Sequence, residues 1–215
     1  MKYQLRAERN KSLSVTEQIF MNRGLALEKI YHFLHTSEND VLEPSTIAHM
    51  RDGAKMLVEA LQKSKRTFIQ IDSDCDGYTS AALLINYLNR IAPYFVNNYL
   101  FYDVQDGKEH GIFIDKIPPN IELVIAPDSS SNDYEVHRTL KEKGIDVLVI
   151  DHHEADHVSE YACVINNQLC DYPTKSLSGV GMVYKFCSYI DELLNKDYAK
   201  DYLDLVAIGL DCLLA

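Results

Sequence analysis

The stretch Thr67–Leu84, TFIQIDSDCDGYTSAALL, decides the fold of this chain. Its apolar run over Phe68–Ile71 predicts a buried strand, because near-continuous apolar residues are typical of strands that are covered on both faces. Gly77 predicts a tight turn after three alternating aspartates, and Thr79–Ser80 predicts the start of a helix over residues 79–91. A strand followed by a turn and a helix indicates one unit of an α/β fold.

Three carboxylates crowd the end of this strand. In an open α/β sheet, ligands bind at the carboxyl ends of the strands. Carboxylates that lie this close together repel one another unless a cation neutralises them. The sequence therefore predicts a divalent-metal site at the strand end, formed by Asp72, Asp74 and Asp76.

These aspartates have two other interpretations. A local turn in which the side chains bond to the backbone would suffice for a single Asp-Gly pair. The pattern D-x-D-x-D-G also begins a calcium-binding EF-hand loop. The twelfth position of that loop is a glutamate, whereas here it is Leu83, and a strand rather than a helix precedes Asp72. The EF-hand is therefore rejected.

Composition indicates an ordinary globular protein. Of the 215 residues, 47% are hydrophobic and 25% are charged, which suits one large domain or a domain with a small appendage. No apolar run reaches the roughly 20 residues of a membrane span, and we expect neither a signal peptide nor a membrane partner. Five cysteines without a C-x-x-C motif favour a reducing cytoplasm and argue against a zinc site.

The formal net charge of −11 limits the partners of this chain. A protein that binds long nucleic acid through its phosphates usually presents a basic face. Bound cations could reverse the field locally, so phosphate chemistry is not excluded. The charge favours short substrates, or a DNA-binding part that lies outside this chain.

The N-terminal part of the sequence is predicted to be helical. We expect residues 1–63 to form a lead-in that packs on the main domain, which spans residues 64–215. Apolar residues recur at helical spacing over residues 15–35, where Gly24 predicts a break. A further helix is expected to begin near Pro44–Ser45.

Strands and helices alternate after residue 66, which predicts a doubly wound, mostly parallel sheet flanked by helices. Further strands are expected over Phe95–Tyr102, Ile121–Ala126, Ile145–Ile150 and Ala162–Ile165, and helices over residues 111–116, 132–143, Ser178–Leu194 and Tyr198–Leu214.

Three of these strands end in residues that can bind metal: IQIDSDCD, LVIAPDSSSND and VLVIDHH. Parallel neighbouring strands present their carboxyl ends at one edge, so these groups can converge. Carboxylates with one or two imidazoles suit manganese or magnesium better than zinc. Enough carboxylates are present for two ions, and a two-metal site suits the hydrolysis of phosphoesters.

The motifs DSDCDG, PDSSSND and DHH, in this order, resemble those of the DHH phosphoesterase superfamily. The stretches IDHHEAD and INNQLCDYPTKSLSGVGMVYKF resemble its RecJ-like branch of single-stranded-DNA exonucleases, and the resemblance covers about residues 66–212. It implies a parallel α/β domain with two divalent ions, manganese preferred and magnesium possible. It also implies hydrolysis of phosphodiester bonds, in the RecJ-like branch from the 5′ end of single-stranded DNA.

The resemblance also implies roles for individual residues. Asp128 should bridge the two metals, and His153 should contact metal or the substrate phosphate. Asp151 should orient an imidazole, as ligating histidines usually require. Residues 129–132 could help to position the site. The other implied metal ligands are Asp72, as ligand or close support, Asp74, Asp76 and His152.

Two further features have alternative interpretations. The backbone amides of Ser178, Gly179 and Gly181 lie at a predicted helix start, where they could hold a substrate phosphate. Close helix packing is an equal alternative for this glycine pair. His110, with Lys108, could face the substrate or belong to a solvated loop.

The sequence departs from the family pattern near its end. In the family, a ligand aspartate follows the glycine of a motif resembling LDLVAIG by about four residues, whereas Asp211 follows Gly209 by two. Asp211 could serve in a shifted register, Asp204 could replace it, or this ligand could be missing. The smaller C-terminal DHH-associated domain of the family is also expected to be absent, so a partner protein could supply its role.

These observations favour a manganese-dependent phosphodiesterase that hydrolyses single-stranded DNA by a two-metal mechanism, with Asp128, His152 and His153 at its catalytic centre. A phosphodiesterase for short oligonucleotides or cyclic dinucleotides is one alternative. A catalytically impaired DHH scaffold that binds a partner or a nucleotide is the other.

Overall fold

Five parallel strands form the central sheet of the computed structural model. They are β1 (Thr67–Ile71), β2 (Leu100–Val104), β3 (Leu123–Pro127), β4 (Asp146–Asp151) and β5 (Cys163–Asn166). Their order in the sheet is β2–β1–β3–β4–β5, so the chain reverses direction across the sheet after β2. The predicted parallel α/β sheet is therefore confirmed.

Helices connect the strands and precede them. They are α1 (Val15–Asn22), α2 (Leu27–Leu34), α3 (Met50–Lys63), α4 (Cys75–Ile91), α5 (Pro93–Tyr99), α6 (Tyr134–Glu142), α7 (Gly179–Leu194) and α8 (Leu203–Leu214). Short 3-10 turns lie at η2 (Pro44–Thr46), η3 (Ile114–Lys116) and η4 (Ala199–Tyr202). Within the residues that the structure describes, no helix is both long enough and apolar enough to cross a membrane.

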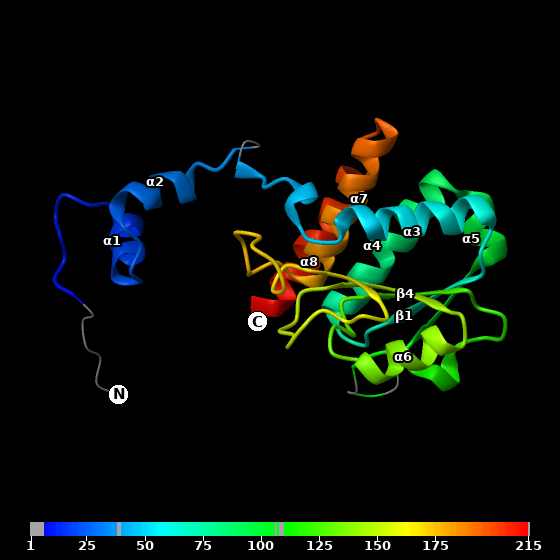
Figure 1. Ribbon diagram of the computed structural model, residues 1–215. Helices are drawn as coiled ribbons and strands as arrows, with labels where there is room; N and C mark the ends of the chain where they lie inside the picture. The colour runs from blue at the N-terminus through cyan, green and yellow to red at the C-terminus, as the bar shows by residue number, and fades with distance from the viewer. Residues whose placement is uncertain (1–6, 38–39, 106, 108–109, 215) are drawn as a thin grey trace. The chain divides into compact units, whose positions relative to one another are not determined.

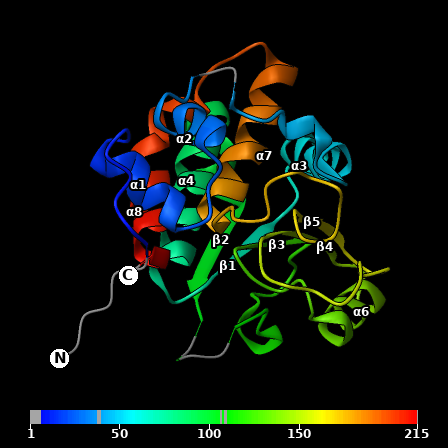
Figure 2. The same ribbon diagram turned by 90° about the vertical axis from the view of Figure 1, so that its left-hand side faces the viewer.

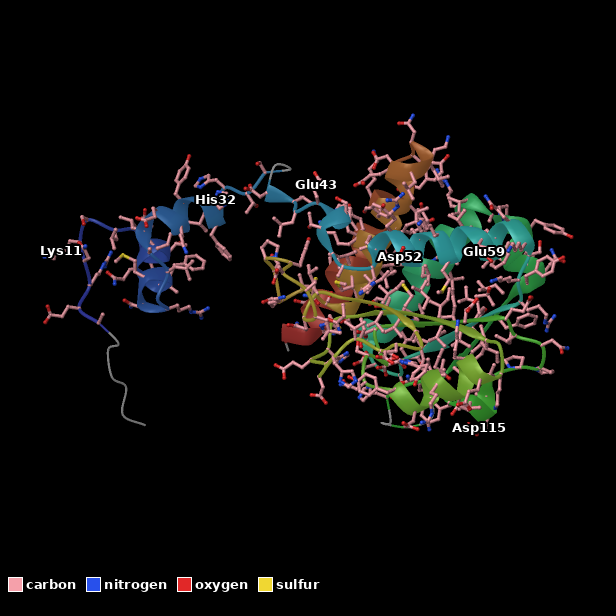
Figure 3. All side chains as sticks on the ribbon, in the orientation of Figure 1. Lys11, His32, Glu43, Asp52, Glu59 and Asp115 are labelled. Atoms are coloured by element: carbon pink, nitrogen blue, oxygen red, sulfur yellow. The ribbon has the colours of Figure 1, made fainter. Side chains whose placement is uncertain are left out.

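The sheet is covered on both faces, as a doubly wound fold requires. Helix α6 lies below β4 in the view of Figure 1, whereas α3, α4 and α7 lie above the strands. Figure 2 shows the same two layers after a turn of 90°. Asp52 and Glu59 lie exposed along α3 (Figure 3), whereas Leu57 and Ala60 of the same helix are buried.

Burial explains why the strands are apolar throughout. Every residue of β1 and β3 is buried. Val124 of β3 and Val149 of β4 belong to a core cluster with Leu140 of α6, so they face that helix. On the other face, Gly53 of α3 lies so close to Leu148 that a Cβ would be 2.9 Å from its Cδ1. Both faces of the sheet therefore exclude water, which fits the continuous apolar runs in the sequence.

The chain divides into two compact units, Met1–Glu43 and Pro44–Ala215. The structure describes residues 7–37, 40–105, 107 and 110–214. In the first unit, α1 and α2 are separated by Gly24 with φ +94°, as the predicted break requires. The structural units divide before α3, whereas the sequence predicts a boundary at residue 63, and that boundary stays a prediction.

The helix after β1 begins earlier than predicted. Helix α4 starts at Cys75 rather than Thr79, because Asp74 is its N-cap and its Oδ1 accepts a hydrogen bond of 2.8 Å from the Gly77 amide. Gly77 is therefore in the first helical turn and not in a tight turn. A Cβ at Gly77 would lie 2.4 Å from the Cβ of Asp72, so close packing explains the glycine.

The strand predicted over Phe95–Tyr102 is wrong in its first half. Residues 93–99 form α5, because Pro93 at the first helical position has the backbone angle that a helix start needs. The strand β2 starts only at Leu100. The short helix predicted over residues 111–116 is the 3-10 turn η3.

Helix boundaries differ from the prediction at two further points. The helix predicted from Pro44 begins at Met50, because His49 adopts a left-handed conformation with φ 62° and separates the turn η2 from α3. The final helix, predicted from Tyr198, is divided into the turn η4 and α8.

One buried histidine gives the fold a pH dependence. His137 of α6 is fully buried, and its Nδ1 lies 3.1 Å from the Ser159 hydroxyl. Its Nε2 is buried without a hydrogen-bond partner among the described residues. Burial lowers the pKa of His137 below 6.5, and the nearby Asp133 opposes this shift only in part.

We expect His137 to destabilise the protein in mild acid. Below about pH 6.5 the unfolded chain takes up a proton that the folded state resists, so the contribution of His137 to the free energy of unfolding should fall as the pH is lowered. The melting temperature of His137→Gln should therefore rise relative to that of wild type as the pH is lowered from about 7.5 to about 5.5. The matched control His35→Gln replaces an exposed histidine and should keep the same difference from wild type at both pH values. An unchanged difference between wild type and His137→Gln would contradict this assignment.

Candidate metal centre

The carboxyl ends of β1, β3 and β4 bring the predicted metal-binding residues to one edge of the sheet. The parallel register places Ile69 beside Ile125 and Pro127 beside Ile150. The residues that follow these strands therefore lie close together, although they are distant in the sequence. This convergence is the arrangement expected from the three strand-end motifs.

Two clusters at this edge have the composition of metal sites. The ligand atoms of Asp72, Asp74 and Asp128 lie within 4.8 Å of one another, and so do those of Asp128, His152 and His153. Asp128 belongs to both clusters and therefore lies between two possible ion positions. Carboxylate oxygens with imidazole nitrogens are ligands suited to manganese or magnesium.

Asp128 lacks the partners that a buried carboxylate normally has. Its side chain is 1% exposed, and neither oxygen has a hydrogen-bond partner among the described residues. The Nε2 of His152 is 3.2 Å from Oδ1, but the two are not aligned as a hydrogen bond. Burial, with repulsion from Asp76 and Asp151, raises the pKa of Asp128 to about 9. A divalent cation would supply the missing positive charge, so these residues fit a bound metal.

Asp128 also adopts an unusual backbone conformation. Its φ is +72°, and that of Ser130, two residues later, is +80°. Non-glycine residues in this left-handed region are uncommon and collect at functional sites. The Asp128 amide still donates to the Ile150 carbonyl at 2.8 Å, which fixes the loop to the end of β4.

Asp151 holds one imidazole in place. Its Oδ1 lies 2.7 Å from Nδ1 of His153 and accepts hydrogen bonds from the amides of His152 and His153, while Oδ2 accepts one from the Ser131 amide. Burial would raise the pKa of Asp151, but these hydrogen bonds outweigh it and lower the pKa to about 2. The same contact raises the pKa of His153. With Nδ1 occupied, His153 can offer its Nε2 to a metal or a phosphate.

Asp76 belongs to neither of the two clusters. Its oxygens accept hydrogen bonds from the backbone amides of Gly179 at 2.7 Å and Val180 at 2.9 Å, so it caps the start of α7. Its Oδ2 is also 3.6 Å from the Nε2 of His152. The structure thus places Asp76 beside the candidate metal centre, and its predicted role as a ligand stays a prediction.

Gly179, the first glycine of the pair in α7, has a clear packing role. A Cβ at Gly179 would lie 1.9 Å from Oδ1 of Asp128, so only glycine fits there. The Gly181 amide donates to the Ser178 hydroxyl at 3.1 Å, and the Gly179 amide is occupied by Asp76. Close packing, the alternative left open by the sequence, therefore explains Gly179. The predicted phosphate contacts of Ser178, Gly179 and Gly181 stay a prediction.

His110 lies at the edge of the sheet that carries the two clusters, which we call the metal edge. Its contacts fit both interpretations that the sequence allows, a residue facing the substrate and a residue of a solvated loop. Its Nδ1 is 2.7 Å from Oδ2 of Asp72, and its ring centroid is 6.3 Å from that of His153. The side chain is still more than half exposed. Lys108, its predicted neighbour at the substrate, lies outside the described residues.

Neither candidate for the fourth motif belongs to one of the two clusters of possible ligands within the described residues. Asp211 and Asp204 are both exposed on α8. Asp204 accepts a hydrogen bond of 2.9 Å from the Leu205 amide. Gly209 of the same helix lies so close to Asp76 that a Cβ would be 3.0 Å from its Oδ1. Helix α8 thus reaches the metal edge, and a ligand from it remains a prediction.

The sequence analysis did not identify two side-chain amides that donate hydrogen bonds to the backbone carbonyls of His152 and His153. Asn166, at the end of β5, donates to the Ser131 hydroxyl at 2.8 Å and to the His153 carbonyl at 2.9 Å. Gln168 donates to the His152 carbonyl at 3.0 Å. The signal in the sequence is the polar run N-N-Q directly after an apolar strand.

A pocket adjoins the second cluster. Its volume is about 600 Å³, and Ser130, Asn132, Asp133, His153 and Glu154 are among the residues that line it. This volume falls in the range of roughly 300–1,000 Å³ that is common for ligand sites. A ligand held at His153 could therefore extend into this pocket.

Comparison with known proteins places this chain in a family. The model of the DHH family, N-terminal domain, matches residues 66–210. The chain is 43% identical over 210 residues to YorK of Bacillus subtilis (strain 168), whose name describes an SPbeta prophage-derived single-strand DNA-specific exonuclease. That match covers 97% of this chain and 36% of YorK. The single-stranded-DNA-specific exonuclease RecJ of the same bacterium is 26% identical, with 95% of this chain and 27% of RecJ covered.

Solved structures show the same fold. The crystal structure of exonuclease RecJ bound to manganese matches with a TM-score of 0.68 and 24% identity, over 79% of this chain and 44% of that one. RecJ of Thermus thermophilus in complex with Mn²⁺ matches with a TM-score of 0.64 and 23% identity, over 76% of this chain and 24% of that one. The chain spans about a third of the length of the curated relatives named above.

Gly179→Ala should damage the metal centre, because its Cβ would collide with Asp128. We expect the affinity for Mn²⁺, measured by calorimetric titration, to fall about tenfold or more. Gly181→Ala is the matched control, since it adds the same methyl group in the same helical turn. Its Cβ would lie 3.3 Å from the Ser178 hydroxyl, so the affinity should change little. Equal losses in the two variants would contradict the proposed contact.

Asp128→Asn should stabilise the metal-free protein at pH values near 8. The folded state keeps a proton on Asp128 up to a pKa of about 9, whereas the unfolded chain releases it near 3.8, so stability falls as the pH rises between these values. Asparagine is neutral and tolerates the left-handed backbone. We expect a higher melting temperature than wild type in chelator, and no further increase when Mn²⁺ is added.

The matched control is Asp52→Asn, which removes an exposed carboxylate on α3. It should leave both the melting temperature in chelator and the stabilisation by Mn²⁺ unchanged. A lower melting temperature for Asp128→Asn than for wild type in chelator would show that the carboxylate is not destabilising.

Proposed function

Because this chain belongs to the DHH family, we propose that it is a divalent-metal-dependent phosphodiesterase that degrades single-stranded DNA from an end. The observation that carries the proposal is the position of Asp128, which is shared by two clusters of possible ligands and lacks other partners among the described residues. The names of YorK and RecJ, both single-strand DNA-specific exonucleases, support this substrate.

The residues at the sheet edge have separate tasks in this proposal. Asp72, Asp74 and Asp128 would hold one divalent ion, and Asp128 with His152 the other. When bound, such ions lower the pKa of water and stabilise the charge on the attacking and leaving oxygens. His153, oriented by Asp151, would direct its Nε2 towards the substrate phosphate.

Manganese is the ion we propose, with magnesium as the possible substitute. The carboxylate-rich ligand set suits both ions. RecJ has been crystallised with Mn²⁺ and with Mg²⁺, and the manganese-bound structures share the fold of this chain. The two clusters around Asp128 support a count of two ions.

The charge of the chain favours a second substrate class. With a net charge of −11, the protein would repel a long polyanion except where bound cations reverse the field. Short oligonucleotides or cyclic dinucleotides carry few phosphates and are therefore the alternative substrates. Comparing the turnover of a dinucleotide with that of a long oligomer separates the two classes.

The test is manganese-dependent release of mononucleotides from a 5′-labelled single-stranded oligonucleotide. We expect labelled mononucleotide with wild type, and a loss of about a hundredfold or more with Asp128→Ala, because the shared ligand is removed. Asp52→Ala removes an exposed carboxylate on α3 and should retain full activity. An intact oligonucleotide across a range of Mn²⁺ and protein concentrations would refute the proposal.

A further inference from the structure

One buried amide links the segments that follow three neighbouring strands. Asn166 ends β5, lies beside Asp151 in the register and is 1% exposed. Its Nδ2 donates to the Ser131 hydroxyl after β3, at 2.8 Å, and to the His153 carbonyl after β4, at 2.9 Å. Its Oδ1 accepts a hydrogen bond of 2.8 Å from the Gln168 amide after β5. The side chain therefore uses both donors and an acceptor.

These contacts complete the support of His153. Asp151 holds the imidazole through Nδ1, at 2.7 Å, while Asn166 holds the backbone carbonyl of the same residue. The Ser131 amide donates to Asp151, and the Ser131 hydroxyl accepts from Asn166. Asp151 and Asn166 thus form a closed set of hydrogen bonds with Ser131 and His153. Asn166 itself belongs to neither cluster of possible ligands.

We propose that Asn166 is a positioning residue, which fixes the His153 segment so that Asp128, His152 and His153 keep the spacing that a divalent ion requires. The inference rests on the proposed function of the same site. The contacts of Asn166 to the segments that carry Ser131 and His153 distinguish it from a residue that stabilises only the fold. Supporting groups of this kind typically change metal affinity by about 10- to 100-fold when they are replaced.

The next residue provides a matched control. Asn167 is also fully buried, and its Nδ2 donates to the Thr174 carbonyl at 3.0 Å. Within the described part of the chain, no hydrogen bond of its side chain reaches Ser131, Asp151 or His153. Asn167 therefore has the burial and the chemistry of Asn166 without its contacts to the metal edge.

The test compares Asn166→Asp with Asn167→Asp. Each change keeps the size of the side chain, buries a carboxylate and turns a donor into an acceptor that faces a backbone carbonyl. We expect both variants to lose melting temperature. Only Asn166→Asp should weaken the binding of Mn²⁺ in calorimetric titration, by about 10- to 100-fold. In the metal-free protein, only Asn166→Asp should speed the hydrogen exchange of the His152 and His153 amides.

Asn166→Ser and Asn167→Ser repeat the comparison without a buried charge, in case the aspartate variants fail to fold. Equal Mn²⁺ affinities in the two members of a pair, equal exchange rates, or a wild type that does not bind Mn²⁺ would overturn the inference. If wild type binds Mn²⁺ but leaves DNA intact, the proposed function fails, and a selective loss of affinity at Asn166 still supports the positioning role.

Discussion

Electrostatic repulsion among buried carboxylates at one sheet edge is the constraint on which this structure depends. Asp72, Asp76, Asp128 and Asp151 are each at most 2% exposed. Ionised carboxylates lose the stabilisation of water in such a place, so each needs another source of positive potential. The fold supplies it from the start of α7, from imidazoles and from backbone amides. The neighbouring loops and helices are arranged around these contacts.

The acids at this edge have different numbers of hydrogen-bond partners, and the difference indicates where a cation would bind. Asp151 accepts hydrogen bonds from His153 and Ser131, which lower its pKa to about 2. Burial and neighbouring acids instead raise the pKa of Asp128 to about 9, because no hydrogen bond from the described residues compensates. The same environment thus holds one carboxylate ionised and leaves another in need of a cation. A protein built only for stability would have replaced the second with a neutral residue.

Sequence reasoning succeeded where a local pattern implies a position in space. Apolar strands that end in acids or histidines predict convergence, because parallel strands share their carboxyl edge, and the structure brings Asp72, Asp128 and His152 together there. The predicted start of α4 is too late, because Asp74 caps a helix that begins at Cys75 although the surrounding residues have the pattern of a turn. The contact partners of Asn166 and Gly179 could not be predicted, because they lie on segments that only the tertiary fold brings near.

Because the chain is acidic, bound metal ions would attract the substrate phosphate in addition to their part in the proposed reaction. A net charge of −11 disfavours the approach of DNA, and bound cations would reverse the field locally. Such cations would bind at the edge at Asp128, where the two clusters meet. Substrate binding and catalysis would then depend on the same ions, because the protein surface adds little attraction of its own. Under the proposed function His153 would link binding and catalysis, since Asp151 fixes its Nδ1 and its Nε2 would be available to the phosphate.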